Sequence, residues 1–197
     1  MSGAPAVFVD RDGTLIREVG YLSREEQLEL LPQVPEAIRL LHRHGFKVVV
    51  ITNQSAVARG ILREDELREI HRELERRLAG AGGAVDGIYY CPHHPTEGLA
   101  PYRLSCDCRK PSAGLVERAA KELGLDPSRS YVVGDQMSDM ELAARIGAKG
   151  IFIRDPQEGG AQGAVNGPQS IVVTTQSLWS AAQWIVQDLR NRGRHEK

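Results

Sequence analysis

The stretch that decides the fold lies at the start of the chain, where residues 5–10 read PAVFVD, a short apolar run that ends in an aspartate. Similar runs recur as KVVVIT at 47–52, YVVG at 131–134, GIFI at 150–153 and IVV at 171–173, and GIYY at 87–90 is a weaker candidate. Continuous Val and Ile runs are typical of strands that are covered on both faces, as in a parallel sheet.

Helical patterns lie between these runs. Residues 64–78 place Leu and Ile at spacings of three and four, and further helices are predicted at 35–44, 112–123, 138–146 and 178–189. The helix at 138–146 opens with Ser138 and Glu141 at the spacing of a capping box. The alternation predicts an α/β fold, a Rossmann-like, doubly wound and mainly parallel sheet with helices on both faces.

The 197 residues suit one domain, which we place at 1–190 and follow with a polar, flexible tail at 191–197. Residues 155–170 are rich in Gly and Gln and predict a mobile surface loop. A net charge of −1 gives no basic surface for nucleic acid or anionic membranes, and no apolar run is long enough to span a bilayer. Without a signal-peptide pattern, we expect a cytoplasmic monomer.

Polar side chains follow several of the predicted strands. Asp10 and Asp12 follow the first, Thr52 ends the second, Asp135 follows YVVG, and Lys110 precedes a helix. Ligands of open α/β sheets bind beyond the carboxyl ends of the strands, so these groups should converge. A carboxylate that attacks a phosphate ester needs a cation to offset the charge repulsion, and Mg²⁺ prefers oxygen ligands.

These residue types suit phosphoryl transfer. Asp10 is the candidate nucleophile, Asp12 the candidate acid and base, and Thr52 and Lys110 would stabilise the phosphoryl oxygens. Mg²⁺ would be held by Asp10, by Asp135 and by the backbone carbonyl of Asp12. Two alternatives are weaker. Aspartates at strand ends also occur as turn residues, and Asp-x-Asp-Gly also begins EF-hand loops, but here a strand precedes it and Tyr21 occupies the position of the EF-hand glutamate.

In order, four motifs of this chain resemble those of the haloacid dehalogenase superfamily: Asp10-x-Asp12-Gly13-Thr14, Thr52-Asn53, Lys110-Pro111 and Gly134-Asp135-x-x-x-Asp139. The resemblance implies a Rossmann-like core, an aspartyl-phosphate on Asp10, acid–base work by Asp12 and a magnesium ligand in Asp135. It implies a supporting role for Asp139.

The cysteines and a histidine form a second constellation. Cys91, His93, Cys106 and Cys108 lie close in sequence, and an odd number of cysteines without a secretion signal argues against a disulfide framework. Three Cys and one His are a common closed zinc set. His94 could replace His93, although alternation along an extended segment favours His93. The alternative is that the cysteines are simply small core residues.

A zinc-binding loop at 91–108 would position Arg109 and Lys110, which follow it directly. The intervals from Asp12 to Thr52 and from Thr52 to Lys110 are already filled by predicted elements and by this loop. We therefore expect no inserted cap domain, and a site whose specificity comes from short loops.

Within the superfamily, the chain is similar to the D-glycero-D-manno-heptose 1,7-bisphosphate 7-phosphatase family. The similarity rests on GIYYCPHHP at 87–95, CDCRKP at 106–111 and TNQS at 52–55. It implies Mg²⁺, Zn²⁺ and hydrolysis of the 7-phosphate of a sugar bisphosphate. It also implies these substrate contacts: Glu18, Val19, Gly20, Tyr21, Asn53, Gln54, Ser55, Arg59, Arg109 and Gln136.

Two departures from the family pattern are Gln136, where Lys is usual, and Ala56, where Gly is usual. The first leaves the anomer preference open. A histidinol-phosphate phosphatase, or another small-molecule phosphomonoesterase, is the alternative enzyme. A zinc-stapled interaction module is the alternative without catalysis, and the intact Asp10 and Asp12 argue against it.

Two sets of side chains are expected to have no part in chemistry. Helical patterns place His42, His44 and His71 on solvated faces, and Trp179 and Trp184 are expected to pack against the core.

Overall fold

Six strands form one sheet in the order β3-β2-β1-β4-β5-β6, and every neighbouring pair is parallel. The computed structural model describes residues 3–154 and 171–195, so the predicted mobile loop at 155–170 lies outside the described residues. The strands are β1 (Ala6–Val9), β2 (Lys47–Asn53), β3 (Gly87–Cys91), β4 (Tyr131–Gly134), β5 (Lys149–Ile153) and β6 (Ile171–Thr175). The strand order runs outward in both directions from β1, so the predicted doubly wound sheet is confirmed.

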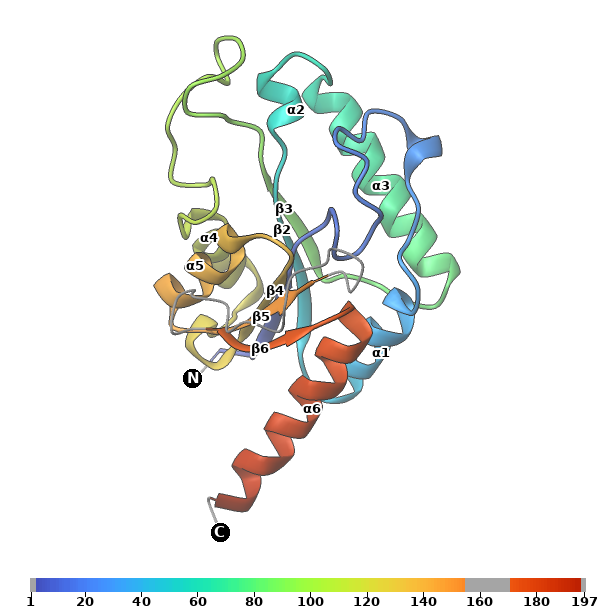
Figure 1. Ribbon diagram of the computed structural model, residues 1–197, viewed down its shortest axis with the longest axis vertical. Coiled ribbons are helices and arrows are strands. Elements are labelled where there is room, and N and C mark those ends of the chain that lie inside the picture. Colours follow the sequence, from blue (N-terminus) through green and yellow to red (C-terminus); the bar gives the residue numbers. More distant parts are fainter. Residues whose placement is uncertain (1–2, 155–170, 196–197) are drawn as a thin grey trace.

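Helices cover both faces of this sheet (Figure 1). The helices α4 and α5 lie on one face, and α1, α3 and α6 lie on the other. Their bounds are α1 (Val34–Arg43), α2 (Ser55–Ala58), α3 (Glu64–Gly80), α4 (Gly114–Leu123), α5 (Met137–Ile146) and α6 (Leu178–His195), with 3-10 turns at η1 (Glu25–Gln27) and η2 (Pro127–Arg129).

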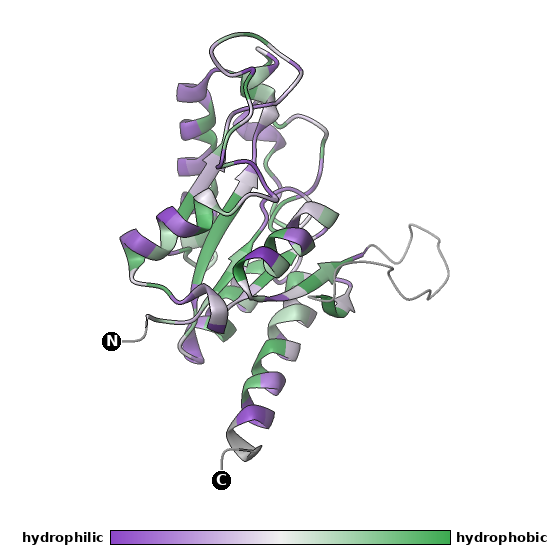
Figure 2. Cartoon of the chain, turned by 90° about the vertical axis from the view of Figure 1, so that its left-hand side faces the viewer, coloured by the Kyte–Doolittle hydropathy of each residue, from purple (hydrophilic) through white to green (hydrophobic). Residues whose placement is uncertain are grey.

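Each central strand contributes side chains to two separate cores. On β2, Val48 and Val50 pack with α1, α3 and α6, whereas Val49 and Ile51 pack with α4 and α5. Figure 2 shows the result, since the apolar strands lie between helices whose outer surfaces are hydrophilic. As predicted, the Val and Ile runs are unbroken because these strands are buried on both faces of the sheet.

The predicted cap of α5 is wrong. We expected Ser138 and Glu141 to form it, but the helix begins one residue earlier, after Gln136. The carboxylate that closes the first turn belongs to Asp139, which accepts a hydrogen bond from the Gln136 N–H at 3.2 Å. A residue at the third helical position has the right reach for this bond, and Asp139 occupies it.

The last helix is longer than predicted. The described part of α6 runs to His195, so residues 191–195 are helical where we expected a polar tail. Trp179 and Trp184 pack against the core from this helix, as predicted. No helix in the described ranges combines the length and the apolar composition that crossing a bilayer requires.

The carboxyl edge of the sheet is bordered by irregular chain. Within the described residues, only η1 and α1 lie between β1 and β2, and no helix or strand lies between β3 and α4. This arrangement agrees with the prediction that no cap domain is inserted. In Figure 1 the segment after β3 and the segment after β1 flank this edge from opposite sides.

Burial on both sheet faces can be tested with adjacent valines. Val49→Ala and Val50→Ala should each lower the free energy of unfolding by about 2 kcal/mol, because both side chains are 0% exposed and each loses buried apolar groups. Val172→Ala, on the edge strand β6 and 39% exposed, should cost less than about 1 kcal/mol. Urea denaturation of the three variants makes the comparison. If Val49→Ala or Val50→Ala hardly changed the free energy of unfolding, the sheet face that carries that side chain would have to be exposed to solvent.

Candidate active site

Most of the predicted site residues meet in one cavity of about 250 Å³ at the carboxyl edge of the sheet. It lies where β1, β2 and β4 end, which is the point from which the strand order runs in opposite directions. Predicted residues that line the cavity are Asp10, Asp12, Glu18, Gly20, Tyr21, Thr52, Asn53, Gln54, Ser55, Arg109, Lys110, Asp135 and Gln136.

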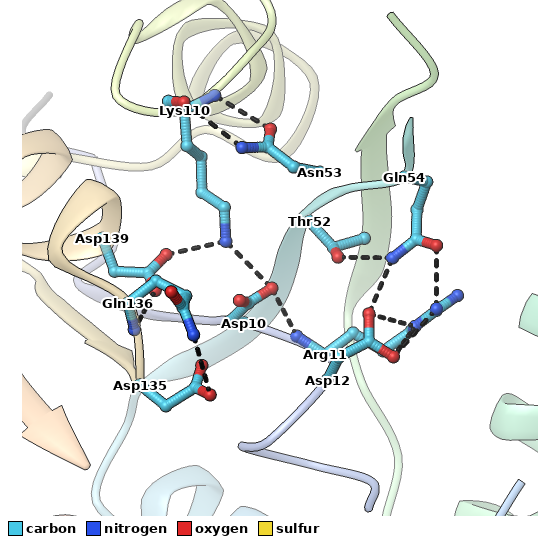
Figure 3. Close-up of polar contacts among 10 residues, drawn as sticks. All are labelled: Asp10, Arg11, Asp12, Thr52, Asn53, Gln54, Lys110, Asp135, Gln136 and Asp139. Atoms are coloured by element: carbon cyan, nitrogen blue, oxygen red, sulfur yellow. Dashed lines mark hydrogen bonds and ion pairs between the residues drawn. The ribbon is translucent and has the colours of Figure 1, made fainter. Parts of the chain in front are cut away.

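A buried lysine forms the centre of the site. Lys110 is 4% exposed, and its Nζ lies 2.9 Å from Asp10 Oδ1 and 2.7 Å from Asp139 Oδ1 (Figure 3). Burial alone would lower the pKa of Lys110, but the charges of Asp10 and Asp139 outweigh burial and raise it. The ammonium group is therefore a fixed positive charge beside the candidate nucleophile.

Asn53 holds the backbone of Lys110 at both ends. Its Oδ1 accepts from the Lys110 N–H at 3.0 Å, and its Nδ2 donates to the Lys110 carbonyl at 3.2 Å. We expected Asn53 to contact substrate. That contact stays a prediction, since Asn53 lines the cavity, and its side-chain amide also bonds the main chain of Lys110 and orients it.

Three carboxylates are grouped so that they could hold a metal ion. One oxygen from each of Asp10, Asp135 and Asp139 lies within 4.8 Å of the others. Asp135 Oδ1 is buried and makes no hydrogen bond among the described residues. Burial, with the nearby charge of Asp10, raises the pKa of Asp135 to about 6. A buried carboxylate oxygen that lacks a partner fits an oxygen-seeking divalent cation such as Mg²⁺.

A glycine makes room for this group. Gly13 has φ +70°, and a Cβ there would lie 2.2 Å from Asp135 Oδ2. Gln136, the departure from the family pattern, donates from Nε2 to the same oxygen at 3.3 Å. The Gly in Asp-x-Asp-Gly is thus required by the side chain of Asp135, the candidate metal ligand, which packs against it.

Asp12 lies in a separate polar network. Its carboxylate accepts from Arg11 Nη2 at 2.9 Å and from Gln54 Nε2 at 2.8 Å, and the same Gln54 nitrogen donates to Thr52 Oγ1 at 2.9 Å. The side chain of Asp12 is therefore not part of the carboxylate group around Asp135. Its proposed contribution to the metal is through its backbone carbonyl and stays a prediction.

Sequence reasoning missed two members of this network. Arg11 is 1% exposed, and its Nη1 lies 3.2 Å from Nε2 of His71, which is 6% exposed. The expectation that His71 is solvated is wrong, because position 71 lies four after Leu67 and three before Leu74, on the buried stripe of α3. That spacing was a usable signal. Arg11 gave a weaker one, as a charged residue between two strand-end aspartates.

Val19 and Arg59, both predicted to bind substrate, are not among the residues that line the cavity. Val19 points outward and is 39% exposed. Arg59 forms an ion pair with Glu97 and lies over the Tyr21 ring, 5.7 Å from its centroid. Through these two contacts, the guanidinium of Arg59 connects the loop around Tyr21 to the segment after β3.

The Cys and His side chains form a compact group beside the cavity. Cys108 Sγ lies 3.1 Å from Cys91 Sγ and 3.2 Å from Cys106 Sγ, and His93 Nδ1 lies 3.3 Å from Cys108 Sγ. These separations are too long for disulfides of about 2.0 Å and approach the ~3.8 Å edge of a tetrahedron with ~2.3 Å zinc–sulfur bonds. His93, rather than His94, completes the group.

Arg109 connects this group to the cavity. It lines the cavity wall, and its Nη1 donates to the His93 carbonyl at 3.0 Å. Fixing the Cys/His group therefore fixes Arg109 and, one residue further, Lys110.

The fold and the site define the class of the protein. It is an α/β phosphotransfer protein in which the candidate nucleophile follows the first strand. Residues 107–176 match the family model described as HAD-hydrolase-like. The chain is 42% identical to the D-glycero-beta-D-manno-heptose-1,7-bisphosphate 7-phosphatase of Photorhabdus laumondii over 75% of this chain and 79% of that protein. It is 36% identical to the Yersinia pestis protein of the same name over 94% and 91%.

A solved structure gives the same result. The D,D-heptose 1,7-bisphosphate phosphatase of B. bronchiseptica, determined with magnesium and phosphate, superposes with a TM-score of 0.78 at 30% identity, over 93% of this chain and 99% of that one. The chain therefore belongs to the heptose 1,7-bisphosphate 7-phosphatase family of the HAD superfamily.

The fit between Gly13 and Asp135 can be tested with a matched pair of alanine variants. Gly13→Ala should lower kcat/KM by more than about 100-fold and weaken Mg²⁺ activation, because the added Cβ must displace the Asp135 carboxylate. Gly45→Ala carries the same backbone strain at φ +82° with nothing within 4 Å, so it should cost about 1 kcal/mol of stability and leave activity unchanged. Normal Mg²⁺ activation in Gly13→Ala would contradict the packing argument. Mg²⁺ titrations of phosphate release measure both variants.

Proposed function

We propose that this protein hydrolyses the 7-phosphate of D-glycero-D-manno-heptose 1,7-bisphosphate through an aspartyl-phosphate on Asp10. The observation that carries the proposal is the position of the Asp10 carboxylate, at the end of β1 and 2.9 Å from the buried Lys110 ammonium. A carboxylate held beside a fixed cation can approach a phosphate dianion that would otherwise repel it.

The two oxygens of Asp10 have different environments. Within the described chain, the Arg11 N–H at 2.7 Å and Lys110 Nζ at 2.9 Å both contact Oδ1. These contacts leave Oδ2 as the oxygen that attacks phosphorus. Thr52 Oγ1, 1% exposed at the end of β2, is placed to donate to a phosphoryl oxygen, and Lys110 offsets the charge that builds on the others.

Mg²⁺ would be held by Asp10, Asp135 and the backbone carbonyl of Asp12, with Asp139 behind them. When bound, it neutralises negative charge on the phosphoryl group and on the two carboxylates. Asp135 is suited to that role, because its Oδ1 is buried and has no hydrogen-bond partner among the described residues.

Asp12 moves the protons. As Asp10 bonds to phosphorus, the bond from phosphorus to the sugar oxygen breaks, and Asp12 gives that oxygen a proton. A water molecule then attacks the aspartyl-phosphate while Asp12 takes its proton. Inorganic phosphate leaves, and the carboxylate of Asp10 is regenerated.

The sugar and its second phosphate would meet the loops at the cavity mouth. Glu18, Gly20 and Tyr21, from the segment after β1, and Arg109, from the segment before α4, all line the cavity. The planar guanidinium of Arg109 can bind two oxygens of a phosphate at once. The Photorhabdus laumondii and Yersinia pestis relatives are named for the β anomer, so this anomer is the first substrate to test.

The group formed by Cys91, His93, Cys106 and Cys108 is proposed to bind Zn²⁺. Four protein ligands close the coordination shell, so the metal has no open position for a reacting water and acts on structure. Its contribution to catalysis would be to hold Arg109 and Lys110 in place through the chain that joins them to Cys108.

Substrate choice and the nucleophile are tested together by phosphate release. The purified protein should prefer the β anomer of the heptose bisphosphate over histidinol phosphate by at least about 100-fold in kcat/KM, since only the bisphosphate can engage Arg109. Asp10→Asn should abolish turnover, because an amide cannot form the acyl phosphate. Preference for histidinol phosphate would replace the proposed substrate, and residual turnover by Asp10→Asn would remove the proposed nucleophile.

Loss of the proposed zinc can be produced with one substitution. Cys106→Ser should purify with less than half of the zinc bound by the original protein, unfold at a lower temperature and lose kcat/KM by about tenfold, because the chain before Lys110 loses its anchor. Ser105→Ala, exposed in the same loop, is the control and should keep its zinc. Metal analysis and thermal unfolding give the answer. Full zinc content in Cys106→Ser would exclude this cysteine as a ligand.

A further inference from the structure

A histidine is buried beside the site without lining the cavity. His71 lies on α3, is 6% exposed, and packs against Tyr90 with ring centroids 5.2 Å apart. Its Nε2 lies 3.2 Å from Arg11 Nη1. A polar side chain is costly to bury among the apolar residues of α3 unless a hydrogen bond compensates, and Arg11 supplies one.

The direction of this hydrogen bond is fixed by chemistry. A guanidinium has only donors and stays protonated in proteins, so Nε2 of His71 must be the acceptor and Nδ1 must carry the proton. Burial, with the positive charge of Arg11, lowers the pKa of His71 to about 3. The imidazole is therefore neutral under ordinary conditions and acts only as an oriented acceptor.

Arg11 connects His71 to Asp12 and Gln54 in the site. Besides the Nη1 contact with His71, its Nη2 donates to Asp12 Oδ1 at 2.9 Å and to Gln54 Oε1 at 2.8 Å. Its Nε lies 3.2 Å from both oxygens of Asp12. The guanidinium is a rigid plane, so a bond on Nη1 limits how the edge that faces Asp12 can rotate. Figure 3 shows that edge meeting Asp12 and Gln54.

We propose that His71 is a positioning residue for proton transfer: it holds Arg11, and Arg11 holds the Asp12 carboxylate where it reaches the leaving oxygen. This inference rests on the proposed function, in which Asp12 donates that proton. His71 contacts neither Asp10 nor Lys110 in the described structure, and Arg11 reaches Thr52 only through Gln54, so the largest effect of His71 should fall on the step that needs Asp12.

The leaving group separates positioning from general damage. An alkyl phosphate, such as a sugar phosphate, releases a strongly basic alkoxide and needs the proton of Asp12 as the bond breaks. p-Nitrophenyl phosphate releases a weakly basic phenolate that needs no proton. The ratio of kcat/KM for the two substrates therefore reports on Asp12, because kcat/KM covers the reaction only through release of the first product.

The experiment measures this ratio in three variants. His71→Leu, which fills the site without an acceptor, should lose kcat/KM for the sugar phosphate by about 10- to 100-fold and for p-nitrophenyl phosphate by less than about threefold. His71→Gln, which restores an acceptor near the position of Nε2, should recover the ratio to within about threefold of the original protein. Ile70→Val, the neighbouring core residue, is the matched control and should leave the ratio unchanged.

Several outcomes would overturn the proposal. Equal losses on both substrates in His71→Leu would show a merely structural role, and so would the same change of ratio in Ile70→Val. If His71→Leu does not fold, His71→Met replaces it, and an unchanged ratio there is equally decisive. The substrate is an independent matter. If the original protein hydrolyses another alkyl phosphate but not the heptose bisphosphate, the proposed substrate fails, and the ratio is measured with that alkyl phosphate.

Discussion

The site depends on one buried ammonium group placed between two carboxylates. Lys110 Nζ contacts Asp139 at 2.7 Å and Asp10 at 2.9 Å, and all three side chains are almost completely shielded from water. Isolated charges are very costly in such a place, and removing one partner of a buried pair typically costs about 3–5 kcal/mol. This constraint joins the end of β1, the chain before α4 and the first turn of α5. It also sets the electrostatics that allow a carboxylate to approach a phosphate.

The rest of the architecture holds this lysine in place. Asn53, at the end of β2, bonds both backbone groups of Lys110, and the group of Cys91, His93, Cys106 and Cys108 lies directly before it in the chain. Neither the Asn53 amide nor the Cys/His group forms or breaks a bond in the proposed reaction. Both work because Lys110 lies on irregular chain, which has no regular hydrogen-bond ladder to fix it and needs other anchors. The Cys/His group thus supports the active site by holding the chain that carries Lys110.

The two aspartates of Asp-x-Asp are two residues apart and have different surroundings. Asp10 lies among Lys110, Asp135 and Asp139, whereas Asp12 accepts from Arg11 and Gln54. Separate environments suit the two proposed roles, in which Asp10 is the nucleophile and Asp12 gains and loses a proton. Arg11, the residue between them, helps to keep them apart by donating its backbone N–H to Asp10 and its guanidinium to Asp12.

The sequence by itself determined the parallel sheet, every α-helix of the described chain except the short α2, the set of strand-end groups and the Cys/His group. These features depend on local periodicity and on the rule that parallel strands end at one edge, both of which are visible in a linear chain. Only the tertiary structure decided that His71 contacts Arg11, that Asn53 holds Lys110, and that Arg59 pairs with Glu97 rather than lining the cavity. The first two contacts join residues 60 and 57 positions apart. Such pairings depend on how separate helices and loops pack together, and no local pattern specifies them.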